Sequence, residues 1–137
     1  MIAAALAETH RLAFDGKGWP AADFERYLGD TTILIHGTDT CFAVFRLAEP
    51  DAEILTLASH PDAQGQGHAG SMLRGALDAL ARAKIETVFI EVADDNAAAL
   101  ALYARARFAQ FSTRCNYYAN GASAICMKAV LSPASGA

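Results

Sequence analysis

Gln64-Gly65-Gln66-Gly67-His68-Ala69-Gly70 joins an apolar β-type run, residues 53–58, to an amphipathic run expected to be helical over residues 67–83. A glycine-rich connection of this kind suits phosphate binding. The first N–H groups of a helix have no partner inside the helix, and the helix dipole is positive there. Glycines also let the backbone come close to an anion. The stretch therefore predicts an anion-binding site at the start of the helix.

The composition of the 137-residue chain predicts a single domain over residues 1–131 and a disordered tail over residues 132–137. The chain is 53% hydrophobic, and its net charge of −4 argues against a nucleic-acid partner. No apolar run is long enough to cross a bilayer, and the N-terminus does not resemble a signal peptide. Three cysteines without metal-ligand spacing and scattered histidines favour a cytoplasmic protein with reduced thiols and no metal site.

The order of the predicted elements indicates an α/β (α+β) fold, a mixed sheet with helices packed on it. Turns are expected at Gly37 to Asp39 and, as a tight hairpin, at Asn120-Gly121. The predicted helices cover residues 2–14, Pro20 to Gly29, 67–83 and 96–105, and the predicted strands cover 32–36, 41–45, 53–58, 87–92, 109–118 and 123–131.

The glycine stretch fits the dinucleotide-binding pattern G-x-G-x-x-G, and Glu91 follows Gly70 by about 20 residues, as a ribose-binding acid would. The context opposes this interpretation. Residues 59–64 separate the strand from the glycines, and Pro61 cannot continue a strand ladder. Too little chain remains for a second mononucleotide-binding half. A glycine-rich turn that merely opens an ordinary helix is a further alternative.

Gln64-x-x-Gly67-x-Ala69 matches the Q/R-x-x-G-x-G/A signature of the GNAT N-acetyltransferase superfamily. Asn96-x-x-Ala99-x-x-Leu102-Tyr103 resembles its second coenzyme-binding helix. The chain most resembles the RimI branch, the ribosomal-protein alanine acetyltransferases, over about residues 19–131. Further matching residues are Trp19, Phe24, Glu53 to Ala58, Ile90 to Val92, and Asn116 to Tyr118.

This resemblance implies the GNAT fold, a mixed, mostly antiparallel sheet with flanking helices. It also implies acetyl transfer from acetyl-CoA to an amine, with no metal. It implies as acceptor the N-terminal α-amino group of a protein, possibly a small-subunit ribosomal protein. A small amine or a lysine side chain is an alternative acceptor, and a non-catalytic acetyl-CoA-binding regulatory module is an alternative function. The sequence leaves the acceptor open, and for the assembly we expect a monomer or a weak dimer.

The resemblance also implies which residues bind the coenzyme. The free edge of the strand would pair with the pantetheine arm as an added strand does, and an N–H near Leu57 would stabilise the developing oxyanion. Asn96 is expected to bind the coenzyme and to cap its helix, or to serve only as a cap. The implied coenzyme-binding residues are Leu57, Ala58, Ser59, Gly65, Gln66, Gly67, His68, Ala69, Gly70, Asn96 and Tyr103.

Two residues are candidates for proton transfer. Glu91 would be the general base, directly or through a water, because an α-amino group titrates near ~8. Strand alternation places Glu91 on the face of Phe89, where apolar neighbours would raise its pKa. The alternative is a glutamate at a solvated strand end. Tyr103, two helical turns after Asn96, would be the general acid for the thiolate, or else an ordinary core tyrosine.

The chain departs from the family pattern in three places. Arg107 stands where glycine is common, at a cost of about 1 kcal/mol if the backbone there has a positive φ. Gly65 and Gly70 replace residues that are usually basic, so coenzyme binding is expected to rest more on backbone than on charge. The usual first strand is absent, which would leave one sheet edge exposed.

Overall fold

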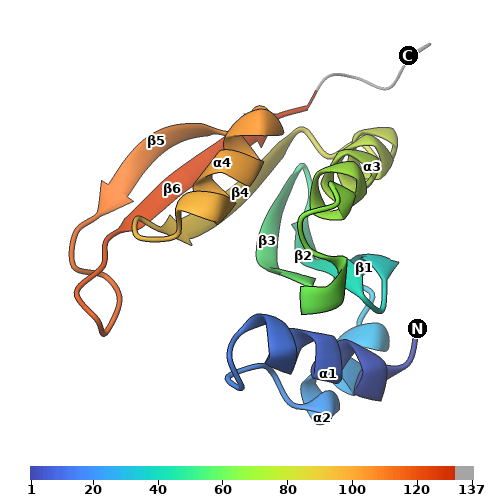
Figure 1. Ribbon diagram of the computed structural model, residues 1–137. Coiled ribbons are helices and arrows are strands. Elements are labelled where there is room, and N and C mark those ends of the chain that lie inside the picture. The colour runs from blue at the N-terminus through green and yellow to red at the C-terminus, as the bar shows by residue number, and fades with distance from the viewer. Residues whose placement is uncertain (132–137) are drawn as a thin grey trace.

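The computed structural model describes residues 1–131 and contains a six-stranded sheet with helices on both faces (Figure 1). The tail predicted at residues 132–137 lies outside the described residues. Among the described residues, no helix is long and apolar enough to span a membrane. In chain order the elements are α1 (Ala3–Ala13), α2 (Ala21–Leu28), β1 (Ile33–Thr38), β2 (Cys41–Ala48), β3 (Asp51–Ser59), a short 3₁₀ helix η1 (Pro61–Ala63), α3 (His68–Arg82), β4 (Thr87–Ala93), α4 (Ala97–Arg105), β5 (Ala109–Arg114) and β6 (Ala124–Val130).

The strand order is β1-β2-β3-β4-β6-β5, and every neighbouring pair is antiparallel except β3 and β4. The predicted mixed, mostly antiparallel sheet is therefore confirmed. The parallel pair follows from the crossover through α3, which returns the chain to the same end of the sheet. Alternate residues of β2 serve two cores: Ala43 and Phe45 pack with α3, whereas Phe42 and Val44 pack under α1 and α2.

Strands β3 and β4 separate soon after they begin. Only residues 51–53 of β3 pair with residues 87–89 of β4. Opposite β2, the register shifts so that Leu55 is an extra residue in β3, which is a β-bulge. A bulge bends and twists its strand. The remainder of β3, through Ser59, therefore pairs with β2 alone and presents a free edge toward β4.

Two predicted turns differ from the structure. The β1–β2 turn lies at Asp39 and Thr40, and Gly37 belongs to β1, where a side chain would collide with the Cys41 carbonyl. Strand β5 ends at Arg114, so Asn120-Gly121 lies inside a longer loop, residues 115–123, and not in a tight hairpin. This loop is held by bonds to Asp94, whose N–H and side chain bond the backbone of residue 123. Such a long-range anchor is invisible to local turn statistics.

The end of α4 is a Schellman motif built without glycine. Arg107 has φ 70°, as the sequence comparison with glycine suggested. The N–H groups of Arg107 and Phe108 bond the carbonyls of Ala104 and Tyr103, and the rings of Tyr103 and Phe108 pack edge to face at 5.4 Å. Helix α3 ends in the same way at Lys84, with φ 69°. Both positions carry the cost of left-handed backbone in a non-glycine residue.

We expect Arg107→Gly to raise the free energy of unfolding by about 0.5–1 kcal/mol, because glycine adopts this backbone without strain. Urea unfolding of both proteins measures the difference. Lys84→Gly changes the equivalent position at the end of α3, and we expect it to raise the free energy of unfolding by the same amount. A destabilised Arg107→Gly protein beside a stabilised Lys84→Gly protein would mean that Arg107 makes a compensating contact.

A buried histidine ties α1 to β3. His10 is only 3% exposed, and its Nδ1 accepts the Trp19 N–H at 2.8 Å. The hydrogen therefore lies on Nε2, which donates to Thr56 Oγ1 at 2.9 Å. Burial lowers the pKa of His10 to about 4. His10 thus stays neutral in the folded protein at neutral pH.

This pKa predicts an acid-sensitive fold. An unfolded histidine titrates near ~6.5, so between pH ~6.5 and about 4 the unfolded chain binds a proton that the folded chain does not. Stability is therefore full above pH ~6.5 and decreases as the pH falls, by up to about 3 kcal/mol. Urea unfolding of the wild type at pH 7 and pH 5 should show this loss of stability. The free energy of unfolding of His10→Gln should fall less between the two pH values. Equal losses in both proteins would exclude His10 as the cause.

Candidate active site

A cavity of about 650 Å³ lies where β3 and β4 separate. Its walls come from four parts of the fold: the C-terminal end of α1, the end of β3, the glycine stretch with the start of α3, and one side of α4. The lining residues are Ala13, Phe14, Leu57, Ser59, Ala63, Gln64, Gly65, Gly67, His68, Ala69, Gly70, Arg74, Asn96, Ala98, Ala99, Leu102 and Arg105.

The backbone of the glycine stretch forms a concave cradle at the N-terminus of α3. Gly65 and Gly67, the N-cap of α3, both have φ 78°, a conformation that favours glycine. Gln64 fastens the stretch to β3, because its Nε2 donates to the Ser59 carbonyl at 3.0 Å. Within residues 1–131, no N–H group from residues 65–70 donates a hydrogen bond. These N–H groups and the helix dipole make the cradle suited to an anion.

Three of the residues expected to bind the coenzyme do not line the cavity. Ala58 faces α1 and α2, so that only its backbone belongs to the free strand edge. The Gln66 side chain turns outward and bonds His68 Nε2 at 2.9 Å. Tyr103 lies in the core. The expected residues that do line the cavity are Leu57, Ser59, Gly65, Gly67, His68, Ala69, Gly70 and Asn96.

Asn96 caps α4, since its Oδ1 accepts the Ala99 N–H at 3.1 Å. Its side-chain NH₂ group donates to no other group among residues 1–131. One end of this amide therefore holds the helix and the other is free toward the cavity. The two suggested roles of Asn96 are compatible in this geometry.

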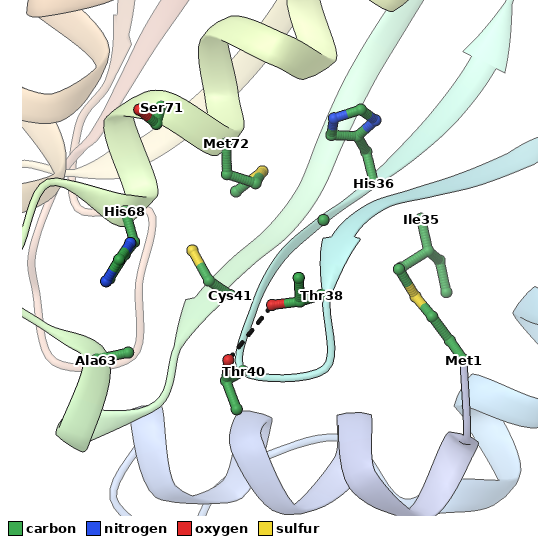
Figure 2. A pocket seen from close by; sticks show the side chains of 11 residues that line it. Met1, Ile35, His36, Thr38, Thr40, Cys41, Ala63, His68, Ser71 and Met72 are labelled. Atoms are coloured by element: carbon green, nitrogen blue, oxygen red, sulfur yellow. Dashed lines mark hydrogen bonds between the residues drawn. The ribbon is translucent and has the colours of Figure 1, made fainter.

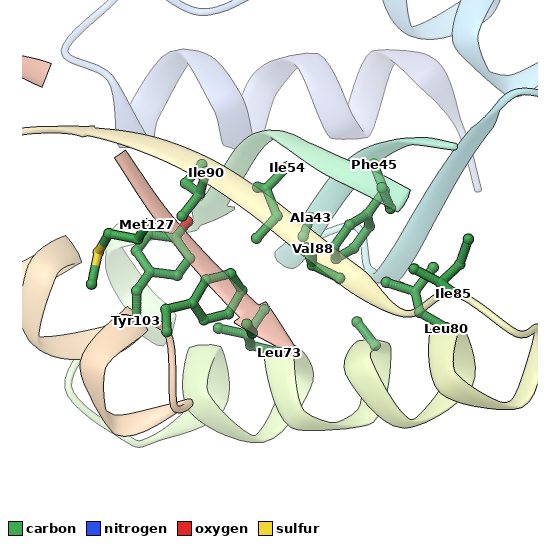
Figure 3. Close-up of a cluster of buried hydrophobic side chains, with 14 of the residues drawn as sticks. Ala43, Phe45, Ile54, Leu73, Leu80, Ile85, Val88, Ile90, Tyr103 and Met127 are labelled. Carbon is green, nitrogen blue, oxygen red and sulfur yellow. The ribbon is translucent and has the colours of Figure 1, made fainter. Parts of the chain in front are cut away.

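Tyr103 is a core residue on α4, only 5% exposed (Figure 3). It belongs to the same buried cluster as Ile90 of β4 and Met127 of β6. Burial raises the pKa of Tyr103 well above its usual range, so the phenol remains protonated at neutral pH. The ring is fixed by Phe108, and the hydroxyl has no hydrogen bond within the described chain. Tyr103 is thus a held, protonated donor.

Glu91 lies on the opposite face of β4, in a smaller cavity of about 270 Å³. Other walls of this cavity are Glu53, Phe89, Phe111 and Arg114. The Glu91 side chain is 35% exposed, and its Oε1 lies 3.3 Å from Arg114 Nη2. The expected burial among apolar neighbours is wrong, because the helices on this face cover β1 to β3 and leave β4 open.

Phe14, Arg74 and Arg105 are among the cavity residues that sequence reasoning missed. Phe14 comes from the end of α1, and only the fold brings it to the glycine stretch. Arg74 and Arg105 supply the only positive side chains among the lining residues, apart from a histidine. The spacing of four residues from Gly70 to Arg74 was a usable signal, because it places both on one helix face.

The sheet edge at β1 borders a separate cavity of about 730 Å³ (Figure 2). It extends from Ser71 and Met72 of α3, past His36 of β1, to Met1 before α1. It does not reach α4 or the free edge of β3. Within residues 1–131, no group of three His, Cys, Asp or Glu side chains is arranged to hold a metal ion. Arg74, Arg105, Gly65 and Gly67, which distinguish the cavity at the glycine stretch, do not line this one.

Comparison with known proteins agrees with this geometry. The model of the acetyltransferase (GNAT) family matches residues 11–108. The chain belongs to the GNAT family. Its fold is the GNAT fold, and it is an N-acetyltransferase that uses acetyl-CoA. The dinucleotide-binding interpretation is wrong: η1 separates β3 from the glycines, and Glu91 faces a different cavity from the glycine stretch.

The RimI branch is confirmed as the similar branch of the GNAT family. The ribosomal protein bS18-alanine N-acetyltransferase of Escherichia coli K12 is 31% identical over 109 residues, which cover 80% of this chain and 73% of that protein. The crystal structure of the E. coli ribosomal-protein-S18-alanine N-acetyltransferase matches with a TM-score of 0.84 and 27% identity, over 98% of this chain and 90% of that chain. A Bacillus subtilis acetyltransferase in complex with CoA shares the fold, with a TM-score of 0.72 and 16% identity over 93% and 91% of the two chains.

The residues of the cavity at the glycine stretch fit coenzyme A. Its phosphates match the N–H cradle and the two arginines, and no Asp or Glu lines the cavity. The amide groups of the pantetheine arm match the free edge of β3, which offers alternating N–H and C=O groups. Leu57 and Leu102 provide apolar surface that suits the methylene groups of the pantetheine arm.

Proposed function

We propose that this GNAT enzyme acetylates the α-amino group at the N-terminus of a protein, with a small-subunit ribosomal protein as acceptor. The observation that carries the proposal is the cavity around Glu91, on the opposite face of β4 from Tyr103 and beside the separation of β3 and β4. Its small volume and its carboxylates, Glu53 and Glu91, suit the amine of a small first residue. The similarity to enzymes that are named for ribosomal protein alanine supports the same acceptor.

Glu91 is the proposed general base. An acceptor amine is protonated below pH ~8 and must lose a proton before it can attack. The Glu91 carboxylate can accept that proton directly or through a water. Arg114 holds the carboxylate at 3.3 Å, and the Tyr117 ring in turn packs on the Arg114 guanidinium at 5.4 Å. The pair thus orients Glu91 at the surface without burying it.

Tyr103 is the proposed proton donor on the other side of β4. When bound, the coenzyme supplies the thioester carbonyl that the amine attacks. The leaving sulfur needs a proton or a hydrogen bond, and the protonated phenol can give either. A backbone N–H near Leu57, on the free edge of β3, would stabilise negative charge on the carbonyl oxygen. Base and acid then act from opposite faces of one strand.

A thiol-release assay tests the proposal with peptides that begin with Ala, Ser or Met and with free polyamines. We expect the peptide beginning with Ala to be the best substrate, because its first residue fits the small cavity. The matched control is the same peptide with a blocked α-amino group, which should not react. Release with polyamines alone would favour the small-amine alternative, and binding of acetyl-CoA without any release would favour the regulatory module.

We further propose a cytoplasmic enzyme that acts as a monomer or a weak dimer. Cys41, Cys115 and Cys126 are free thiols in the described chain, which fits a reducing compartment. Sedimentation at several protein concentrations would measure the assembly.

A further inference from the structure

The cavity at the glycine stretch is lined by positively charged side chains, although the stretch itself contains none. No Lys or Arg occurs from Gln64 to Ser71. Arg74 of α3 and Arg105 of α4 line the cavity from two sides, and no Asp or Glu lines it. In a chain of net charge −4, two arginines that face a cavity without acids mark a place for an anion.

Arg74 lies directly over Gly70. The two residues are one helical turn apart on α3 and share a face. Arg74 Nη1 lies 3.3 Å from the position that a Cβ at residue 70 would occupy, so a side chain there would require the guanidinium to shift by a few tenths of an ångström. The small residue at position 70 is therefore matched to the arginine at position 74.

The Arg74 guanidinium is available to a ligand. Its one hydrogen bond within residues 1–131 is to Ser71 Oγ, and this bond is long at 3.5 Å. It forms no ion pair in the described chain, whereas Arg11, Arg26 and Arg114 all do. An arginine fork that faces a cavity without a carboxylate partner can donate two parallel hydrogen bonds to phosphate oxygens.

We propose that Arg74 supplies the cation for the coenzyme's pyrophosphate that the glycine stretch lacks, and that Gly70 makes room for it. In this arrangement the positive charge at the phosphate site comes from Arg74, in the second turn of α3. The proposal differs from the expectation that binding rests more on backbone than on charge. The inference rests on coenzyme binding in the cavity at the glycine stretch, and it adds a binding residue to that site.

Calorimetric titration of Arg74→Gln with three probes tests the proposal: CoA, 3′-dephospho-CoA and pantetheine. We expect the Kd for CoA and for 3′-dephospho-CoA to rise about tenfold, because a charge-assisted hydrogen bond to the pyrophosphate is lost. The Kd for pantetheine should not change. Arg82→Gln, the same change at the exposed end of α3, is the matched control and should bind all three probes as the wild type does.

A second experiment moves the positive charge from position 74 to position 70. Gly70→Arg combined with Arg74→Gln should recover most of the lost affinity for CoA. An unchanged Kd in Arg74→Gln, or an equal loss for pantetheine, would overturn the proposal. A loss seen with CoA but absent with 3′-dephospho-CoA would assign Arg74 to the 3′-phosphate and would overturn it too. Failure of the wild-type protein to bind CoA would instead overturn the coenzyme site itself.

Discussion

Glu91→Gln is expected to lower kcat about a hundredfold at pH 7, with little change in the Kd for acetyl-CoA. An amide has no basic oxygen, so the variant cannot take the proton from the acceptor amine, and general-base catalysis typically contributes at least about a hundredfold. The deficit should shrink above pH ~8, where the amine is already neutral. Coenzyme affinity should persist because Glu91 lies outside the cavity at the glycine stretch. Steady-state kinetics from pH 6 to pH 10, with a peptide acceptor, measure both effects.

Glu86→Gln, the same change just before β4 and outside both cavities, is the matched control and should behave as the wild type does. If Glu91→Gln kept wild-type kcat at pH 7, the base would be another group, and Glu91 would be a surface glutamate paired with Arg114. Such an exposed pair contributes only about 0–1 kcal/mol to stability, so its loss alone cannot account for a large change in rate.

Tyr103→Phe is expected to lower kcat about a hundredfold while the fold stays intact. Phenylalanine keeps the ring that packs on Phe108, and it removes a hydroxyl that forms no hydrogen bond within the described chain. A structural role would therefore predict almost no effect, whereas loss of a proton donor predicts a large one. Thiol-release kinetics and a thermal melt on the same sample distinguish the two.

Tyr27→Phe, on α2 beside Trp19, provides the matched control, because it removes a phenol far from α4. Full activity in both variants would mean that Tyr103 is an ordinary core tyrosine. A wild-type rate of Tyr103→Phe with an acetyl thioester donor whose leaving thiol is more acidic would support the role of Tyr103, since such a thiolate needs less help from an acid.

Local features of the site were predictable from sequence because they depend on neighbouring residues. The left-handed backbone of Gly67 opens α3, Asn96 caps α4, and Arg107 adopts a positive φ, and each follows from the chemistry of one short segment. The family signature then joins these segments into one coenzyme site. The sheet type also followed, since the order of strands and helices allows few arrangements.

Features that depend on distant partners were not predictable. The bulge at Leu55 separates β3 from β4, and it exists only relative to the register with β2. The environment of Glu91 depends on which strands α1 and α2 cover, and helical periodicity alone does not give that. Each of these is a property of packing between elements, so a pattern within one segment does not contain it.

Mass spectrometry of one reacted peptide tests the central claim most directly. The peptide should begin with Ala and carry one internal lysine, and it should be incubated with acetyl-CoA and the wild-type enzyme. The proposed N-terminal acetyltransferase activity predicts a single added acetyl group, located by fragmentation on the α-amino nitrogen of the first residue. An acetyl group on the lysine side chain, or none at all, would contradict it.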